Sequence, residues 1–286
     1  MITTDFTGNF GNHIFQYVLL RSVAERKNFE WGFTNNIYRD YFGGKPQLDF
    51  FDLDYGQPVE GIEQEYQEKY ITLNGHTNIY FYDTFKDLQD NSKLVGFWQT
   101  EKYFDKEKVR KWLKYKPEIE EKFQDIDIPE NLCIINVRGG EYKLLPEVLL
   151  PLSYWNGAIN HMLRVNKSIQ FAVITDDVPY ASSLFPQFKC YHYSIAMDYY
   201  IINKVRYLIL SNSSFPWFAA WLNENAKFII APKYWARYNI SDGFWANGNI
   251  FTKGWMYYYH KTNKLQTYDE IVKELKESRY SNLYIL

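Results

Sequence analysis

Residues 204–235 read KVRYLILSNSSFPWFAAWLNENAKFIIAPKYW, and this stretch decides the fold. The apolar run Val205–Leu210 predicts a buried strand, and Phe228–Ala231 predicts a second one. Between them a polar turn, Ser211–Ser214, leads into a helix carried by Phe218–Leu222. The order strand, turn, helix, strand is that of a parallel β-sheet unit.

The turn at the start of this helix can be interpreted in two ways. Its hydroxyls and the first free N–H groups of the helix would suit a phosphate. Pro216 fits there, because its missing N–H would have no partner inside the first helical turn. The alternative is a plain crossover between two strands, with no ligand. This segment alone does not distinguish a phosphate site from a plain crossover, so the other segments of the chain are needed.

Length and composition narrow the class of protein. The 286 residues suggest one large domain or two ordinary ones, and a hydrophobic content of 46% is enough for real cores. With 32 basic against 34 acidic residues, a general nucleic-acid binder is not expected. Cys133 and Cys190 form neither a zinc pattern nor a disulfide framework. A reducing cytosol is the simplest compartment.

Targeting signals are not apparent in the sequence. The first residues lack the charged start and apolar run of a secretory signal. No apolar stretch is long enough to span a bilayer. We therefore expect a cytoplasmic protein, with peripheral contact at the inner membrane face left open.

The first 30 residues predict a strand, a glycine turn and a helix. The turn Gly8–Asn12 lets the backbone approach a ligand closely, and the Asn12 amide can donate and accept hydrogen bonds. The alternative is a tight turn that caps the helix. The helix is indicated by apolar residues at helical spacing: Ile14, Phe15, Val18, Leu19 and Val23.

The next hundred residues predict mixed structure that ends at a domain boundary. The expected elements are loops at Tyr38–Gly44 and Asp49–Pro58, strands at Thr77–Tyr82 and Leu94–Trp98, and helices at Asp105–Trp112 and Glu118–Gln124. Asp125–Pro129 is typical of a linker, so we place a domain boundary there.

A second candidate site follows the predicted strand Leu132–Val137. The strand ends in Arg138, followed by Gly139 and Gly140. In parallel sheets ligands bind beyond the carboxyl ends of strands, and an arginine there can direct its guanidinium at a bound anion. The alternative is an arginine in a surface turn.

Two consecutive acids follow the next predicted strand, Ile169–Ile174. Asp176 and Asp177 can bind a metal, cap a helix, or accept hydrogen bonds from a base or ribose. No further acids lie at metal-ligand spacing, so we expect no metal. Helices are predicted at Pro151–Arg164, Asp198–Arg206 and Thr267–Ser278. Strands near 134, 171, 207 and 229, separated by helices, predict a doubly wound α/β domain.

Four separated segments resemble one family, the inverting α-1,2-fucosyltransferases. GNFGNHIFQY at 8–17 is similar to its G-x-L-G-N-Q-M-F-Q-Y, and NVRGGEY at 136–142 to its H-V-R-R-G-D-Y. ITDD at 174–177 resembles F-S-D-D. NSSFPWFAAWL at 212–222, followed by IAPKYW at 230–235, resembles N-S-S-F-S-W-W-x-A-W-L and A-P-K-x-W. The order and approximate spacing hold over nearly the whole chain.

The resemblance implies a GT-B fold, with two Rossmann-like doubly wound domains facing a central cleft. Residues 1–126 would bind the acceptor, and residues 127–264 would bind the nucleotide sugar. The C-terminal helix, within 265–286, would pack back on the first domain. The donor would be GDP-fucose, with no metal and no other cofactor.

The resemblance also implies roles for matching residues. Arg138 would pair with the donor diphosphate. Asp177, together with Asp176, would hold the guanine or ribose. The Asn12 loop would reach across the cleft to donor and acceptor. The turn would bind phosphate through Asn212, Ser213, Ser214 and Phe215.

Several positions depart from the family pattern. Relative to the family pattern, Asn136 replaces a histidine, Gly139 the second arginine, Glu141 an aspartate, His13 a glutamine and Pro216 a serine. These changes are compatible with the nucleotide clamp, and they bear on the identity of the sugar and on whether the enzyme keeps full activity.

Inversion needs a base that takes the acceptor proton, and no base can be matched to the family. Glu147, Glu141 and His13 are candidates by chemistry and position. A surface salt bridge or a helix cap is the alternative role for each.

The resemblance therefore predicts transfer of fucose to a galactose hydroxyl of a surface glycan or a lipid-linked oligosaccharide. A relative that uses another GDP-deoxysugar is the alternative among enzymes. A catalytically inactive module that binds a glycan or nucleotide is the alternative from another class.

Overall fold

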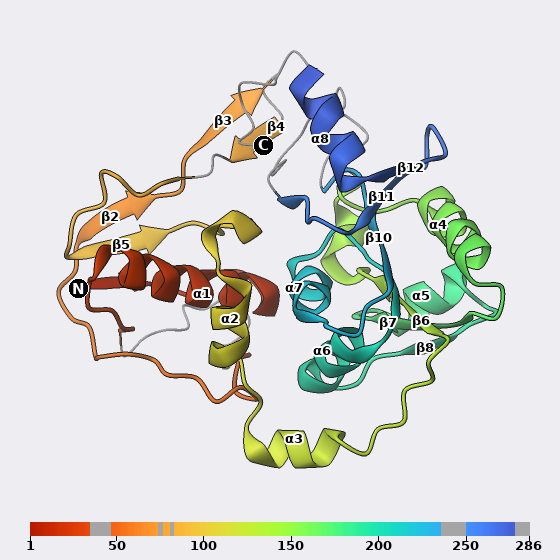
Figure 1. Cartoon of the computed structure of the whole chain (residues 1–286), viewed down its shortest axis with the longest axis horizontal. Coiled ribbons are helices and arrows are strands. Elements are labelled where there is room, and N and C mark those ends of the chain that lie inside the picture. The colour runs from red at the N-terminus through yellow and green to blue at the C-terminus, as the bar shows by residue number, and fades with distance from the viewer. Residues whose placement is uncertain (35–46, 74–76, 81–82, 236–249, 278–286) are drawn as a thin grey trace.

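The structure is a computed structural model that describes residues 1–34, 47–73, 77–80, 83–235 and 250–277. The loop predicted at Tyr38–Gly44 and the last two residues of the strand predicted at Thr77–Tyr82 lie outside the described residues. Two lobes face each other, one built mainly from the first third of the chain and the other from the remainder (Figure 1).

The first lobe contains a small parallel sheet in the order β1-β5-β2. These strands are β1 (Ile2–Thr4), β5 (Ser92–Val95) and β2 (Gln64–Gln67), and α1 (Phe10–Lys27) packs against β1. The sequence correctly predicts β1, the glycine turn and α1. It misses β2, which is polar and mostly exposed and so lacks the alternation of a half-buried strand. A separate antiparallel hairpin joins β3 (Tyr70–Leu73) to β4 (Thr77–Tyr80).

The second lobe contains a seven-stranded sheet in the order β12-β11-β10-β9-β6-β7-β8. All neighbours are parallel except β11 and β12. The bounds are β6 (Leu132–Val137), β7 (Gln170–Thr175), β8 (Lys189–Tyr191), β9 (Tyr207–Ile209), β10 (Phe228–Pro232), β11 (Met256–Tyr259) and β12 (Lys264–Thr267). The expected α/β fold with parallel sheets is confirmed.

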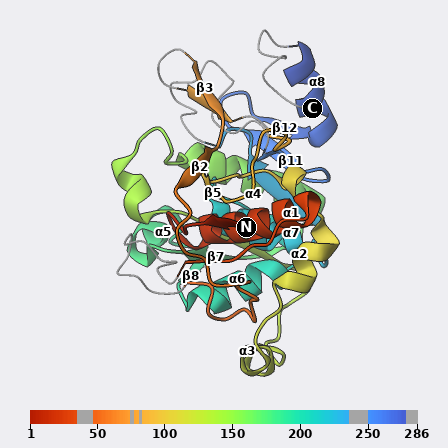
Figure 2. The same cartoon turned by 90° about the vertical axis from the view of Figure 1, so that its left-hand side faces the viewer.

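Helices cover these sheets and connect them. They are α2 (Lys106–Trp112), α3 (Pro117–Phe123), α4 (Leu152–Val165), α5 (Val178–Leu184), α6 (Ile195–Lys204), α7 (Ser214–Leu222) and α8 (Tyr268–Glu277), with 3-10 turns η1 (Glu101–Tyr103) and η2 (Gly140–Leu144). Seen from the side, α3 lies at one end of the molecule and α8 near the other (Figure 2). No helix of the described part of the chain is long and apolar enough to cross a membrane.

The strand order places a crevice at one end of the second sheet. From β6 the chain moves outward to β7 and β8, and then returns to β9 on the other side of β6. The connections that leave the carboxyl ends of β6 and β9 therefore run in opposite directions, and open α/β sheets bind ligands where the strand order reverses in this way. Arg138 follows β6, and the turn Ser211–Ser214 follows β9.

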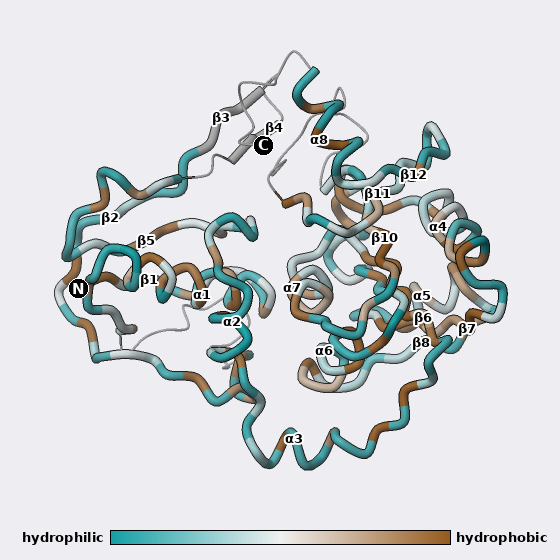
Figure 3. Tube along the Cα trace, viewed as in Figure 1, coloured by the Kyte–Doolittle hydropathy of each residue, from teal (hydrophilic) through white to brown (hydrophobic). Residues whose placement is uncertain are grey.

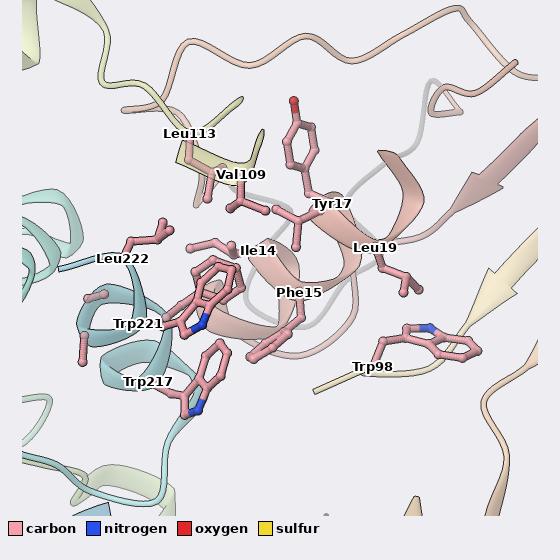
Figure 4. Close-up of a cluster of buried hydrophobic side chains, with 14 of the residues drawn as sticks. Ile14, Phe15, Tyr17, Leu19, Trp98, Val109, Leu113, Trp217, Trp221 and Leu222 are labelled. Atoms are coloured by element: carbon pink, nitrogen blue, oxygen red, sulfur yellow. The ribbon is translucent and has the colours of Figure 1, made fainter. Parts of the chain in front are cut away.

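The two lobes share one hydrophobic core where α1 meets α7. Ile14 and Phe15 of α1 face Trp217 and Trp221 of α7, and the Phe15 ring lies 4.8 Å from that of Trp217 (Figure 4). Hydrophobic residues recur along the inner strands, whereas α2 and α8 are largely hydrophilic (Figure 3). This packing fixes the N-termini of α1 and α7 beside each other.

The last helix, α8, contacts β11 and β12 at the edge of the second sheet. Lys233, which is 9% exposed and follows β10, forms an ion pair of 2.6 Å with Glu274 of α8. The amphipathic helix predicted near this end of the chain is thus present. The division into domains at residues 126 and 264 stays a prediction.

Candidate functional site

A cavity of about 560 Å³ opens between the lobes at the carboxyl ends of β6, β7, β8 and β9. Its walls come from the N-terminus of α1, from the segments after these strands, and from α7. Its lining includes Gly11, Asn12, Gln99, Asn136, Arg138, Glu141, Tyr142, Asp176, His192, Asp198, Ser213, Ser214 and Phe215.

Arg138 lies in this cavity with two carboxylates on its guanidinium. Nη1 donates to Asp176, and Nη2 donates to Glu141 Oε1 at 2.8 Å. The guanidinium carbon also lies 5.5 Å from the centre of the Tyr142 ring. The side chain keeps 22% of its surface exposed, so an anion can reach it. Arg138 is therefore oriented in advance, but its charge is already neutralised.

The two consecutive acids after β7 have different roles in the structure. Asp176 lines the cavity, and its Oδ1 accepts from the Gly139 N–H at 2.8 Å. Asp177 is the N-cap of α5, where it accepts from the Tyr180 N–H at 3.1 Å and pairs with Lys143. These contacts lower the pKa of Asp177, chiefly through the Lys143 hydrogen bond. Asp177 is not among the residues that line the cavity.

The first turn of α7 forms another wall. Ser213 is its N-cap, yet its side chain makes no cap hydrogen bond, and the first turn carries no acid. Pro216 provides no N–H, which leaves the Ser214 and Phe215 N–H groups at the positive end of this helix. Ser213, Ser214 and Phe215 line the cavity as predicted. An anion placed here would also lie near Arg138, which lines the same cavity.

Asn12 joins the two lobes at this point. Its Oδ1 accepts from Gln99 Nε2 at 2.7 Å and from Ser214 Oγ at 2.9 Å. Beside it, Gly11 approaches α7 so closely that a Cβ there would overlap backbone atoms of Ser214 and Phe215. The glycine turn thus allows a close helix-to-helix contact as well as an open cavity wall.

Three other predicted residues do not reach the cavity. Asn212 is buried and donates to the carbonyls of Val148, at 2.9 Å, and Trp235, so it holds the turn in place. His13 is 5% exposed and stacks on Phe6. Burial lowers the pKa of His13 to about 4, so its imidazole is neutral at pH 7. Glu147 lies in the turn after η2 and is not part of the lining. Their proposed roles stay predictions.

Residues that carry no signal in the sequence also line the cavity. His192 follows β8, and its Nδ1 lies 3.0 Å from Asp198 Oδ2 in α6. Asp198 Oδ1 accepts from the Tyr193 N–H at 3.2 Å. Burial raises the pKa of Asp198, while these hydrogen bonds oppose that change. Gln99 comes from the loop after β5. No motif marks these residues, and only tertiary structure brings them together.

The charged residues of the cavity are unbalanced. Among the residues that the structure describes, its lining holds one arginine, Arg138, against the carboxylates of Glu141, Asp176 and Asp198. A bound anion would therefore depend on Arg138 and on N–H groups. Within the described ranges, no group of three or more histidine, cysteine, aspartate or glutamate side chains is placed to hold a metal ion.

Comparisons with known proteins support one class of enzyme. No family model matches the chain. The O-antigen biosynthesis glycosyltransferase WbnK of Escherichia coli is 29% identical over 119 residues, which are 37% of this chain and 39% of WbnK. The chain thus matches about two fifths of the length of that relative. An α-1,2-colitosyltransferase of Escherichia coli is 23% identical over 275 residues, covering 82% of this chain and 92% of that enzyme.

Solved structures with a similar arrangement include the NodZ α-1,6-fucosyltransferase. A NodZ structure with GDP has a TM-score of 0.49 at 14% identity, covering 81% of this chain and 94% of that one. NodZ from Bradyrhizobium has a TM-score of 0.47 at 14% identity, covering 80% and 93%. A glycosyltransferase of family 9 from Veillonella parvula has a TM-score of 0.40 at 10% identity, covering 83% of each chain. The two curated relatives described above are both glycosyltransferases.

Proposed function

We propose that this protein is a glycosyltransferase that takes its sugar from a GDP-sugar bound in the cavity. The observation that carries the proposal is the convergence of Arg138 and the uncapped N-terminus of α7 at the reversal of strand order. Both are donors suited to a diphosphate, and they lie where α/β sheets bind nucleotides. The names of the two relatives support the same class of reaction.

The proposed reaction moves fucose from GDP-fucose to a galactose hydroxyl of a surface glycan, with inversion and an α-1,2 linkage. A new bond forms between the acceptor oxygen and the anomeric carbon. The bond from that carbon to the phosphate oxygen breaks, and its electron pair leaves with GDP. Arg138 and the N–H groups of Ser214 and Phe215 stabilise the charge that develops on the phosphate.

The acceptor proton needs a base within reach. Of the three candidates from the sequence, Glu141, Glu147 and His13, only Glu141 lines the cavity. Its carboxylate is 47% exposed and lies against Arg138. When a diphosphate takes its place on the guanidinium, Glu141 is released and can accept the proton.

The donor sugar has a second candidate, another GDP-linked deoxysugar. One relative that covers most of the chain is named for colitose rather than fucose. Incubation with a panel of GDP-sugars and a galactose-terminated acceptor, followed by analysis of the product, separates the two. Release of GDP and a new α-1,2-linked fucose support the proposal, whereas no transfer from any GDP-sugar, despite GDP binding, favours an inactive binding module.

We predict that GDP binding needs no divalent metal, because the donors named above are cationic or N–H groups. Calorimetric titration with GDP in EDTA should give the same dissociation constant as titration with magnesium, within about twofold. Binding that is abolished by the chelator and restored by magnesium would contradict this prediction.

Variants of two aspartates, Asp198 and Asp177, test which part of the cavity binds the guanine of the donor. Asp198 is the one lining carboxylate, among the described residues, that does not contact Arg138. Its oxygens already lie against His192 and the Tyr193 N–H, but each has a second lone pair, so the carboxylate can still accept the N1–H and the amino group of guanine. Asp198→Asn should weaken the binding of GDP by about tenfold or more, and it should weaken the binding of inorganic pyrophosphate much less.

Asp177→Ala is the comparison for this experiment. It removes the N-cap of α5 and should reduce stability by roughly 0.5–2 kcal/mol. If Asp177 caps a helix and does not touch the base, GDP affinity stays near that of the parent. A selective loss of GDP affinity in Asp177→Ala, with none in Asp198→Asn, would instead support the guanine role that the resemblance implies for Asp177.

A further inference from the structure

The loop that carries Gln99 into the cavity has an unusual backbone. Trp98 has a φ of 56°, which is rare for a large side chain, and Gly96 has a φ of 156°. Such conformations persist only where the surrounding structure enforces them, and they concentrate at functional sites. Trp98 is completely buried, and its ring lies 5.5 Å from that of Phe85 and 5.9 Å from that of Tyr103.

The carboxylate of Glu68 holds this loop in place through hydrogen bonds to its backbone. Its Oε2 accepts from the N–H of Phe97 at 2.7 Å and from the N–H of Trp98 at 3.1 Å. Gln16 of α1 donates to the Gly96 carbonyl at 2.9 Å. Burial raises the pKa of Glu68 to about 7. A protonated carboxyl keeps its carbonyl oxygen, so both hydrogen bonds survive whichever form is present.

The strained loop delivers the Gln99 amide to Asn12. Two donors meet on Asn12 Oδ1, with Gln99 from the first lobe at 2.7 Å and Ser214 from the second at 2.9 Å. Asn12 Nδ2 fills the space beside Gly8, which has a φ of 77° and no room for a side chain. The oxygen end of the Asn12 amide is thus fixed by two donors, and its nitrogen end lies against Gly8, at the junction of the α1 and α7 N-termini.

We propose that Gln99 is a positioning residue, which orients the Asn12 amide and through Ser214 aligns the two lobes for transfer. The inference rests on the proposed function, since it assigns Gln99 a part in that reaction. Arg138 is held by Asp176 and Glu141, and the N–H groups of Ser214 and Phe215 are held by the α7 helix to which they belong. Gln99 therefore affects the transfer step more than the binding of GDP.

Two pairs of variants test this role. Gln99→Ala removes the donor, and Gln99→Glu keeps the size of the side chain while offering Asn12 a carboxylate that cannot donate. Glu68→Ala releases the loop without touching the cavity, and Glu68→Gln retains a carbonyl that accepts both N–H groups. The measurements are kcat and KM with GDP-fucose and a galactose-terminated acceptor, GDP affinity by calorimetry, and circular dichroism as a check of folding.

Both Gln99 variants and Glu68→Ala should lower kcat by about 30-fold or more, since a small misplacement of reacting groups is costly. The dissociation constant of GDP should change less than about threefold in the same proteins, and Glu68→Gln should restore kcat to within about twofold of the parent. Parental kcat in Gln99→Ala and Gln99→Glu would overturn the proposal. So would a loss confined to GDP affinity.

A failure of the proposed function gives a different result. In that case the parent protein would not bind or turn over a GDP-sugar, and kinetics could not report on Gln99. Thermal unfolding of Gln99→Ala, Ser214→Ala and the double variant still tests the link through Asn12. Non-additive changes in Tm are expected for two donors that share one acceptor. Additive changes would contradict the link.

Discussion

Replacement of Arg138 with alanine is expected to lower GDP affinity by about 30- to 1,000-fold, equivalent to about 2–4 kcal/mol. The loss exceeds one hydrogen bond because of the other charges in the cavity. Without the guanidinium, Asp176 and Glu141 lose their partner and repel the diphosphate. Calorimetric titration with GDP measures the effect, and an unchanged thermal transition shows that the fold is intact.

Two further variants separate charge from geometry at this position. Arg138→Lys should restore little affinity, because a single ammonium cannot reach both partners as the planar guanidinium does. Glu141→Gln should bind GDP as well as the parent or better, since a competing carboxylate leaves the guanidinium. If Glu141 also accepts the acceptor proton, the same variant will lose turnover. Near-parental GDP affinity in Arg138→Ala would remove Arg138 from the donor site.

The sequence predicts the inner part of the second lobe well. The strand predicted at Leu132–Val137 matches β6 at both ends, and the helix predicted at Pro151–Arg164 is shifted by one residue in α4. Long apolar or amphipathic segments carry such a signal because burial dominates their composition. By contrast, β8 has three residues and β12 is mostly polar, so neither stands out from a loop.

The site is predictable only in part, for a physical reason. Arg138 and the turn after β9 follow strands at the point of strand reversal, so topology alone brings them together. Two neighbouring side chains such as Asp176 and Asp177 point in different directions, and composition cannot show which one enters the cavity. Gln99 and Asp198 lie far apart in the chain, and their placement depends on how the lobes pack.

The second large effect is expected at Gly11, where the two lobes meet. A Cβ at this position would lie 2.5 Å from Ser214 Oγ and would overlap the Phe215 nitrogen and the Ser214 carbonyl carbon. Backbone atoms cannot rotate away, so Gly11→Ala must separate the N-termini of α1 and α7. We expect a loss of about 1–3 kcal/mol of stability from this overpacking.

The consequence for transfer should be larger than that for stability. Separating the two helices stretches the Asn12–Ser214 hydrogen bond and moves the first lobe away from the second, and a displacement of about 1 Å can lower kcat by about 100-fold. Kinetics with GDP-fucose measure this effect. Thermal unfolding measures the cost in stability separately.

Gly157 in α4 provides the matched control. It is also a helical glycine without room for a Cβ, but the obstacle is the Tyr258 hydroxyl, and neither residue lines the cavity. Gly157→Ala should therefore lose stability and keep its kcat and GDP affinity. If Gly11→Ala loses no more activity than Gly157→Ala at equal stability, the close contact of α1 with α7 supports only the fold. A selective loss of kcat in Gly11→Ala instead ties the glycine turn to the alignment of donor and acceptor.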